Sequence, residues 1–266
     1  MFSNLSTNKI LWSITTGLTF IAASIGIAAP HIYDGVFAKE FIPGALPQDV
    51  LTMILCIFLF YLIIKTKENS LKTQIFIFGI MGSFFYLYGI FTIERVYNFL
   101  YILYCAIFAS SFWSILYSLM RVKSDFLGKL KYSNKLVTLS AVIGILIASL
   151  FTFLWISALI PLMRDRNRIE YLYSIYLLDL CFVMPAFFIT SILSLRKNIV
   201  GILFLPAVFI VGFFVIFPLG LGEIAKPFYG QTINVGSMIM SFLFSFLMIV
   251  VGIGHLNNIH IKDTSS

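Results

Sequence analysis

The chain has 266 residues, of which 60% are hydrophobic and only 11% are charged, and its mean hydropathy is +1.01. A soluble protein carries roughly 25% charged residues, so a chain this apolar cannot cover its surface with polar groups, and a soluble globular domain is excluded in favour of a membrane protein. The net charge of +7 does not indicate a nucleic-acid partner, because the Lys and Arg residues lie in short segments between apolar runs, as membrane topology requires.

Eight segments are long and apolar enough to cross a bilayer as helices, which takes roughly 20 residues each. They lie near 10–30, 47–64, 73–93, 97–120, 136–161, 171–195, 199–221 and 233–254. We therefore predict an all-α fold, a polytopic transmembrane helix bundle that forms a single transmembrane helical domain over residues 1–266. Lys9 and the small residues Ala28 and Ala29 flank the first segment as in a secretory signal, but its apolar run is longer than a signal core. We interpret it as the first membrane helix.

The longest connection, residues 30–47, reads PHIYDGVFAKEFIPGALP, and its prolines and glycines fit either an ordered cap over the bundle or a mobile lid. After it, LPQDV places Pro47, Gln48 and Asp49 in the predicted first turn of the second helix. Proline fits that position, and an acid there complements the helix dipole. This structural role alone explains Asp49, although a place in a ligand site is the alternative.

The distribution of charge predicts the orientation of the bundle. Twelve of the 18 Lys and Arg residues, but only three of the 11 Asp and Glu residues, lie in the N-terminus, the C-terminal tail and the connections after the second, fourth and sixth segments. The other side then holds six basic and eight acidic residues (18 − 12 and 11 − 3). Because short cytoplasmic segments collect Lys and Arg, we expect both termini in the cytoplasm. The twelve basic residues are Lys9, Lys65, Lys67, Lys72, Arg121, Lys123, Lys129, Lys131, Lys135, Arg196, Lys197 and Lys262.

A row of tyrosines follows the third and fourth segments. Tyr97, Tyr101 and Tyr104 recur at helical spacing, with Asn98 beside them. They fit an aromatic belt or packing residues at the outer membrane boundary, and alternatively the lining of a pocket. Tyr86 and Tyr104 lie too deep for the lipid headgroups, so we expect their hydroxyls to have protein partners.

One carboxylate, Asp179, stands in the middle of the apolar run YSIYLLDLCFVMPAFF. It lies nine residues beyond Glu170, roughly 14 Å deep at ~1.5 Å per residue. A charge there costs at least about 2.5–3.5 kcal/mol, so the side chain must face protein or water, or be protonated. Tyr176 lies one turn earlier on the same helix face. Pro185 removes a backbone donor and loosens the helix just inside the aspartate. We predict an outward-facing pocket here; a clamp between helices is the alternative.

The two halves of the chain show one parallel that suggests repeats. A predicted helix ends at Pro30 and another at Pro161, and an acid follows 19 or 18 residues later, Asp49 and Asp179. The residues around these positions do not match between the halves, so packing alone is the other explanation.

QDV in the second helix, YNFLYILYCAIF in the fourth, and YLLDL followed by a proline in the sixth are the chain's most distinctive marks. With them the chain resembles a group of uncharacterised eight-pass bacterial integral membrane proteins, over roughly residues 45–220. Those relatives usually have glycine before the Gln–Asp pair, where this chain has Pro47. The resemblance implies the eight-helix topology and the interest of Gln48, Asp49, Tyr97, Asn98, Tyr176 and Asp179. It implies no activity.

The sequence predicts no metal site and no cofactor. Its three cysteines lie singly in apolar runs and its three histidines lie away from the membrane centre, so disulfides, zinc and haem are not expected.

Three functions fit these marks. The first is binding or transport of a small solute, in the cell (inner) membrane of a bacterium, through a pocket marked by Asp179, Tyr176, Tyr97, Tyr101 and Tyr104. The second is an accessory or scaffold subunit with a membrane protein partner. The third is an intramembrane enzyme acting on a lipid or isoprenoid, with Asp179 and Asp49 as acid and base in one cavity. We expect the first and a non-enzymatic protein, with membrane lipids and a small-molecule ligand as partners.

Overall fold

A computed structural model describes residues 1–122, 130–169 and 173–261. Within these ranges it has eight helices long and apolar enough to cross a membrane, which confirms the predicted all-α bundle. The long helices are α1 (Leu5–Ala28), α2 (Ile42–Lys65), α3 (Leu71–Ile93), α4 (Tyr101–Met120), α5 (Asn134–Asp165), α8 (Ile199–Ala225) and α9 (Val235–Asn258). The remaining span, Tyr173–Leu195, combines α6 (Tyr173–Leu178), a π-helical turn η3 (Asp179–Val183) and α7 (Met184–Leu195).

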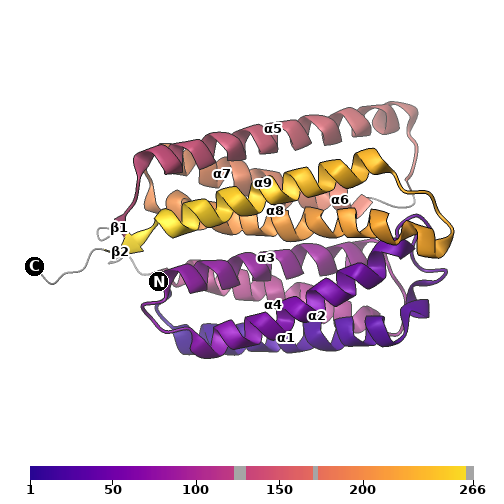
Figure 1. The fold of residues 1–266 in the computed structure, drawn as a ribbon, viewed down its shortest axis with the longest axis horizontal. Coiled ribbons are helices and arrows are strands. Elements are labelled where there is room, and N and C mark those ends of the chain that lie inside the picture. The colour runs from indigo at the N-terminus through magenta and orange to yellow at the C-terminus, as the bar shows by residue number, and fades with distance from the viewer. Residues whose placement is uncertain (123–129, 170–172, 262–266) are drawn as a thin grey trace, which may run out of the picture.

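The helices form two groups that lie side by side, α1–α4 below and α5–α9 above in Figure 1. α3 and α8 make contact where the groups meet. In these two helices 67% and 61% of the most apolar window is buried, compared with 17–39% in the other spans. α3 and α8 therefore form the centre of the bundle, and the exposed apolar residues of the outer helices face lipid.

The helix contacts follow the same plan in both groups. α1 contacts α2 and α4, as α5 contacts α7 and α9; α3 contacts α4, as α8 contacts α9. Across the centre, α2 contacts α8 and α6 contacts α3. Two parallel repeats related by an axis along the membrane normal would have such a plan, so the contacts are compatible with the repeat that the spacing of the acids suggests. Asp49 and Asp179 each lie in the second span of their group, the place where the sequence parallel puts them.

The N-terminus and the last described residues lie at the same end of the bundle (Figure 1). There β1 (Leu130–Lys131) pairs antiparallel with β2 (His260–Ile261), and Phe2 pairs with Val122. Buried His255 joins three helices at this end: its Nδ1 lies 2.5 Å from the Ser140 hydroxyl and its Nε2 3.0 Å from the Ile202 carbonyl oxygen. An even number of spans between the two chain ends explains why both lie here.

The predicted helix positions of Pro47, Gln48, Asp49 and Pro161 are wrong. α2 begins at Ile42, so Pro47 lies inside the helix and Asp49 is not in its first turn. The segment offers two prolines, and the earlier one, Pro43, takes the favoured place at the start of the helix. Likewise, Pro161 lies inside α5, which runs on to Asp165.

The fourth span begins at Tyr101, so Tyr97 and Asn98 precede it in a turn. Arg95 adopts φ 58° in this turn, and the Asn98 Oδ1 accepts a hydrogen bond from the Leu100 N–H at 2.9 Å. An Asn side chain that binds the backbone two residues ahead favours a turn over a helix. Glu94, which comes just before this turn, connects the first helix group to the second. Its Oε1 accepts a hydrogen bond from the Ser174 N–H at 2.8 Å, near the start of α6.

Candidate functional site

A cavity of about 810 Å³ lies between the two helix groups. Its walls come from α2 and α3 on one side and from α5, α6, η3, α7, α8 and α9 on the other. Phe37 and Glu40 from the connection before α2, and Lys226 after α8, place it at the end of the bundle away from β1 and β2. This volume lies in the range of pockets that enclose drug-sized ligands, and a site between repeats is where many transporters bind substrate.

Asp179 lies in the wall of this cavity. It is the first residue of the π-helical turn η3, inside the span Tyr173–Leu195. Only 6% of the residue is exposed, and its Oδ2 accepts a hydrogen bond from the Trp155 indole N–H at 2.6 Å. The hydroxyl of Tyr86, on α3, also faces the carboxylate. Helices from both groups thus hold one carboxylate at the cavity. Since a carboxylate has about four acceptor positions, two donors leave room for a ligand.

The backbone at Asp179 departs from α-helical geometry. The Met184 N–H donates to the Asp179 carbonyl five residues back, and Asp179–Val183 form a π-helical turn that ends two residues before Pro185. This is the loosened helix that the position of Pro185 predicts. Single π-helical turns occur frequently at functional sites, because they redirect the side chains that follow. Glu170, from which the depth of Asp179 is counted, lies outside the described residues.

Tyr176 supports the site without lining the cavity. Its ring packs edge-on against the indole of Trp155, with ring centroids 5.3 Å apart at 86°. This contact fixes the plane of the indole, and hence the direction of the N–H that donates a hydrogen bond to Asp179. Tyr176 therefore positions Trp155 and is not one of the residues that line the cavity.

Gln48 does line the cavity, from α2. Its Nε2 donates to the Thr52 hydroxyl at 3.1 Å, one turn along the same helix. The amide oxygen and the second N–H are then left to meet a ligand. Pro47, which precedes it, is part of the helix and leaves this geometry intact.

An ion pair lies at the rim of the cavity. Lys226 Nζ and Glu223 Oε1 are 2.7 Å apart, with both side chains mostly buried, and Glu223 Oε2 accepts the Asn234 N–H at 2.9 Å. The rim is tied to the opposite group, because Gln231 Nε2 donates to the Lys39 carbonyl at 2.8 Å. This hydrogen bond favours the cap interpretation of the connection before α2.

Asp49 lies apart from this cavity. Its Oδ2 accepts a hydrogen bond from the Tyr33 hydroxyl at 2.7 Å, and the residues are 3% and 2% exposed. Burial, and then the nearby Asp49 charge, raise the pKa of Tyr33 well above its usual range, which keeps the phenol protonated as a donor. A Cβ at Gly26 would lie 2.0 Å from this carboxylate oxygen, so α1 packs directly on Asp49.

Tyr104 and Asn98 extend the cluster around Asp49. Asn98 Nδ2 donates to the Ile32 carbonyl and to the Tyr104 hydroxyl, both at 3.2 Å. Phe91 stacks between Tyr33 and Tyr104, with centroids 5.9 and 5.0 Å away. Tyr86 and Tyr104 thus have the protein partners that their depth predicts. The cluster joins the cap to α2, α3 and α4, and its tyrosines act in packing.

Tyr97 and Tyr101 lie on the outer surface of the bundle. Tyr97 is 63% exposed and packs edge-on against Tyr101, with centroids 4.7 Å apart. The Tyr101 hydroxyl donates to the Thr92 carbonyl at 3.1 Å. Neither residue lines the cavity, so the structure matches the belt interpretation for these two.

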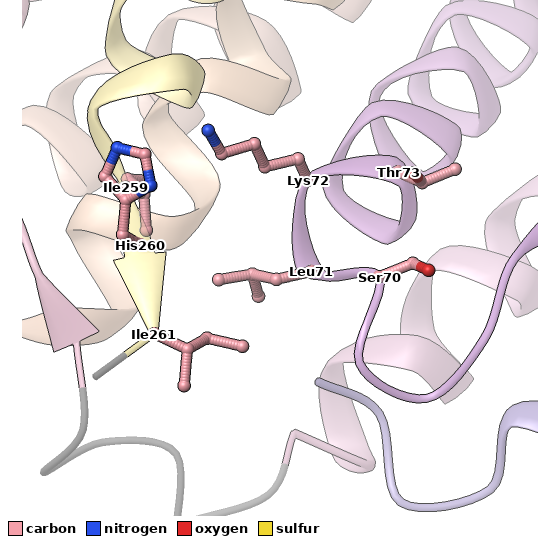
Figure 2. Close-up of a pocket in the computed structure, with 7 residues that line it drawn as sticks. All are labelled: Ser70, Leu71, Lys72, Thr73, Ile259, His260 and Ile261. Carbon is pink, nitrogen blue, oxygen red and sulfur yellow. The ribbon is translucent and has the colours of Figure 1, made fainter. Parts of the chain in front are cut away.

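A smaller cavity of about 300 Å³ lies at the other end of the bundle (Figure 2). It is formed by Ser70–Thr73 and by Ile259–Ile261. Lys72 crosses it and donates from Nζ to the Asn257 carbonyl at 2.9 Å. The lysine therefore ties α3 to α9, and the sequence-predicted site residues all lie elsewhere.

Trp155, Tyr33 and the Glu223–Lys226 pair are the site residues that sequence reasoning misses. Trp155 lies late in its apolar segment, where Trp is typical of the membrane interface. Tyr33 lies in a connection, and its role depends on the path of that connection. The spacing of Glu223 and Lys226 by three residues on a helix was an available signal for the ion pair.

Comparison with protein-family models, with curated proteins and with solved structures finds no match to this chain.

Proposed function

We propose that this multi-pass membrane protein binds or transports a small solute in the cavity at Asp179. The observation that carries the proposal is a carboxylate on a π-helical turn, held by Trp155 and facing an 810 Å³ cavity between the helix groups. A carboxylate inside a membrane protein is costly and is kept mainly where it has a function. A cavity of this size also weighs against the scaffold alternative, which needs only closed packing.

The geometry does not favour the intramembrane enzyme with paired carboxylates. Acid and base catalysis by Asp49 and Asp179 needs both groups at one substrate. Asp179 lines the cavity, whereas Asp49 lies between Tyr33 and Gly26. The proposal is therefore a non-enzymatic binding or transport function.

Native mass spectrometry of the gently purified protein tests the proposal. Wild type is compared with Asp179→Asn, and Asp49→Asn is the matched control, since it makes the same change at the carboxylate outside the cavity. A discrete extra mass in wild type and Asp49→Asn that is absent from Asp179→Asn supports the site. An extra mass that persists in Asp179→Asn contradicts it, and a bare mass in all three supports the scaffold alternative.

We further propose that the protein lies in the inner membrane of a bacterium with both termini in the cytoplasm, so that the cavity faces outward. The support is the excess of Lys and Arg on the side of the termini. In a variant with Cys56, Cys105 and Cys181 replaced, a cysteine at exposed Arg168 should react with an impermeant maleimide in intact cells. A cysteine at Lys131 should react only after permeabilisation. The reverse pattern contradicts this orientation.

A further inference from the structure

We infer that the ligand of the Asp179 cavity is a hydrophobic amine, an apolar molecule with a single protonated nitrogen that pairs with the Asp179 carboxylate. This inference rests on the proposed binding function and narrows it to a class of ligand. Three features of the cavity support it: the balance of its charges, the apolar character of its walls and the aromatic rings around the acid.

The charged residues of the lining are mainly acidic. They are Glu40, Asp179, Glu223 and Lys226, which gives three acids and one base. Lys226 is held by Glu223 at 2.7 Å, so the base is already neutralised. An anionic ligand would meet Asp179 with no cation left to balance it, and like charges in a poorly solvated site repel strongly. The charge balance therefore favours a cation.

The cavity offers few polar groups to a ligand. Besides the four charged residues, its lining has Gln48, Trp155, Tyr86, Ser237 and Ser241 as side chains with polar atoms, and the Trp155 N–H is already donated to Asp179. A sugar or another polyhydroxyl solute would leave most of its hydroxyls without partners, at a cost for each. Leu, Ile, Val, Met and Phe side chains make up most of the wall. The body of the ligand is therefore apolar.

Aromatic rings line the cavity, and two of them face the acid. Trp155 and Tyr86 direct their polar atoms at Asp179, while Phe91, Phe151 and Phe187 line the cavity from α3, α5 and α7. The faces of aromatic rings attract cations within about 6 Å, most strongly when water is excluded. A carboxylate with aromatic neighbours and an apolar chamber matches a protonated amine on a hydrocarbon body.

Three compounds that share one apolar cage test this inference: aminoadamantane, adamantanol and adamantane carboxylate. Their binding to the full-length protein in nanodiscs is measured by isothermal titration calorimetry, with empty nanodiscs subtracted. The proteins are wild type, Asp179→Asn and the control Asp49→Asn. We expect wild type and Asp49→Asn to bind the amine about tenfold or more tightly than the alcohol, with the carboxylate weakest. In Asp179→Asn the affinity for the amine should fall to that for the alcohol. The affinity for the alcohol itself should change by less than about threefold.

Two results overturn the ligand class while leaving the proposed function in place. One is equal binding of the three compounds, or tighter binding of the carboxylate, in wild type. The other is an amine preference that persists in Asp179→Asn. If wild type binds none of the three cages above empty nanodiscs, the ligand class fails, and the native mass spectra decide whether the cavity holds another solute.

Discussion

The regions around Asp49 and Asp179 use the same chemistry for different ends. Each acid lies in the second span of its helix group and accepts a short hydrogen bond from an aromatic side chain, 2.7 Å from Tyr33 and 2.6 Å from Trp155. α3 contributes to both regions, because Tyr86 faces Asp179 and Tyr88 lies near Asp49. Phe91 belongs to the aromatic stack of one region and to the cavity wall of the other.

The two carboxylates differ in what covers the side that their hydrogen-bond donors leave open. At Asp49 it is closed by α1, which approaches at Gly26, and by the buried cap residue Tyr33. At Asp179 it is the cavity. A buried acid with an aromatic donor is thus compatible with a packing clamp and with a ligand site, and the packing of the neighbouring helix decides between them. The two regions therefore predict opposite responses to mutation: loss of stability at Asp49, and loss of binding at Asp179.

The largest expected effect is at Gly26. In Gly26→Val the new Cβ would lie 2.0 Å from Asp49 Oδ2 and 2.7 Å from the Tyr33 hydroxyl, so α1 must move away from the clamp. Overpacking of this kind costs about 3 kcal/mol. The free energy of unfolding, measured by SDS titration in mixed micelles, should fall by that amount.

Gly17→Val is the matched control for Gly26→Val. Gly17 lies on the same helix, and a Cβ there meets nothing within 4 Å. The variants share any effect of valine on helix propensity, so the difference between them isolates the contact with Asp49. Equal losses of stability in the two variants would contradict close packing of α1 on this carboxylate.

Tyr33→Phe should have the next largest effect. It removes the hydroxyl that donates a hydrogen bond to Asp49 and leaves a buried carboxylate without this donor. The loss in the free energy of unfolding should be about 1–3 kcal/mol. The same unfolding titration measures the loss, with Tyr61→Phe as control because Tyr61 is 58% exposed. Amine binding in the cavity should be unchanged. A stable Tyr33→Phe protein with impaired binding would place Asp49 in the ligand site and remove the contrast between the two regions.

The sequence predicts the membrane helices well because an apolar run of about 20 residues has few other uses. The helix starts are harder to predict, since they depend on local choices. α2 begins at Ile42, with Pro43 in its first turn, although Pro47 fits a helix start equally well, and the turn at Asn98 makes α4 begin only at Tyr101. Asp179 stands out from sequence alone because the cost of a carboxylate in the membrane does not depend on the fold.

The partners of the two acids could not be predicted in the same way. Trp155 and Asp179 are 24 residues apart on different spans, and Tyr33 reaches Asp49 through the path of the cap. Both contacts depend on tertiary packing, which leaves no periodic signal in the chain. For the same reason Tyr97, Tyr101 and Tyr104 look alike in sequence, although the structure exposes Tyr97 and buries Tyr104.

The smallest expected effect is that of Trp155→Phe. This variant tests whether the region of Asp179 depends on the Trp155 N–H as much as the region of Asp49 depends on the Tyr33 hydroxyl. The change removes the N–H donated to Asp179 at 2.6 Å but keeps a ring against Tyr176. Because the cavity gives this carboxylate room for other partners, we expect a loss of only about 1 kcal/mol in the unfolding titration. Trp113→Phe, at a position 60% exposed, is the control. A loss as large as that of Tyr33→Phe would mean that Asp179, too, is a packing clamp, since a carboxylate open to a ligand has less to lose from one missing donor.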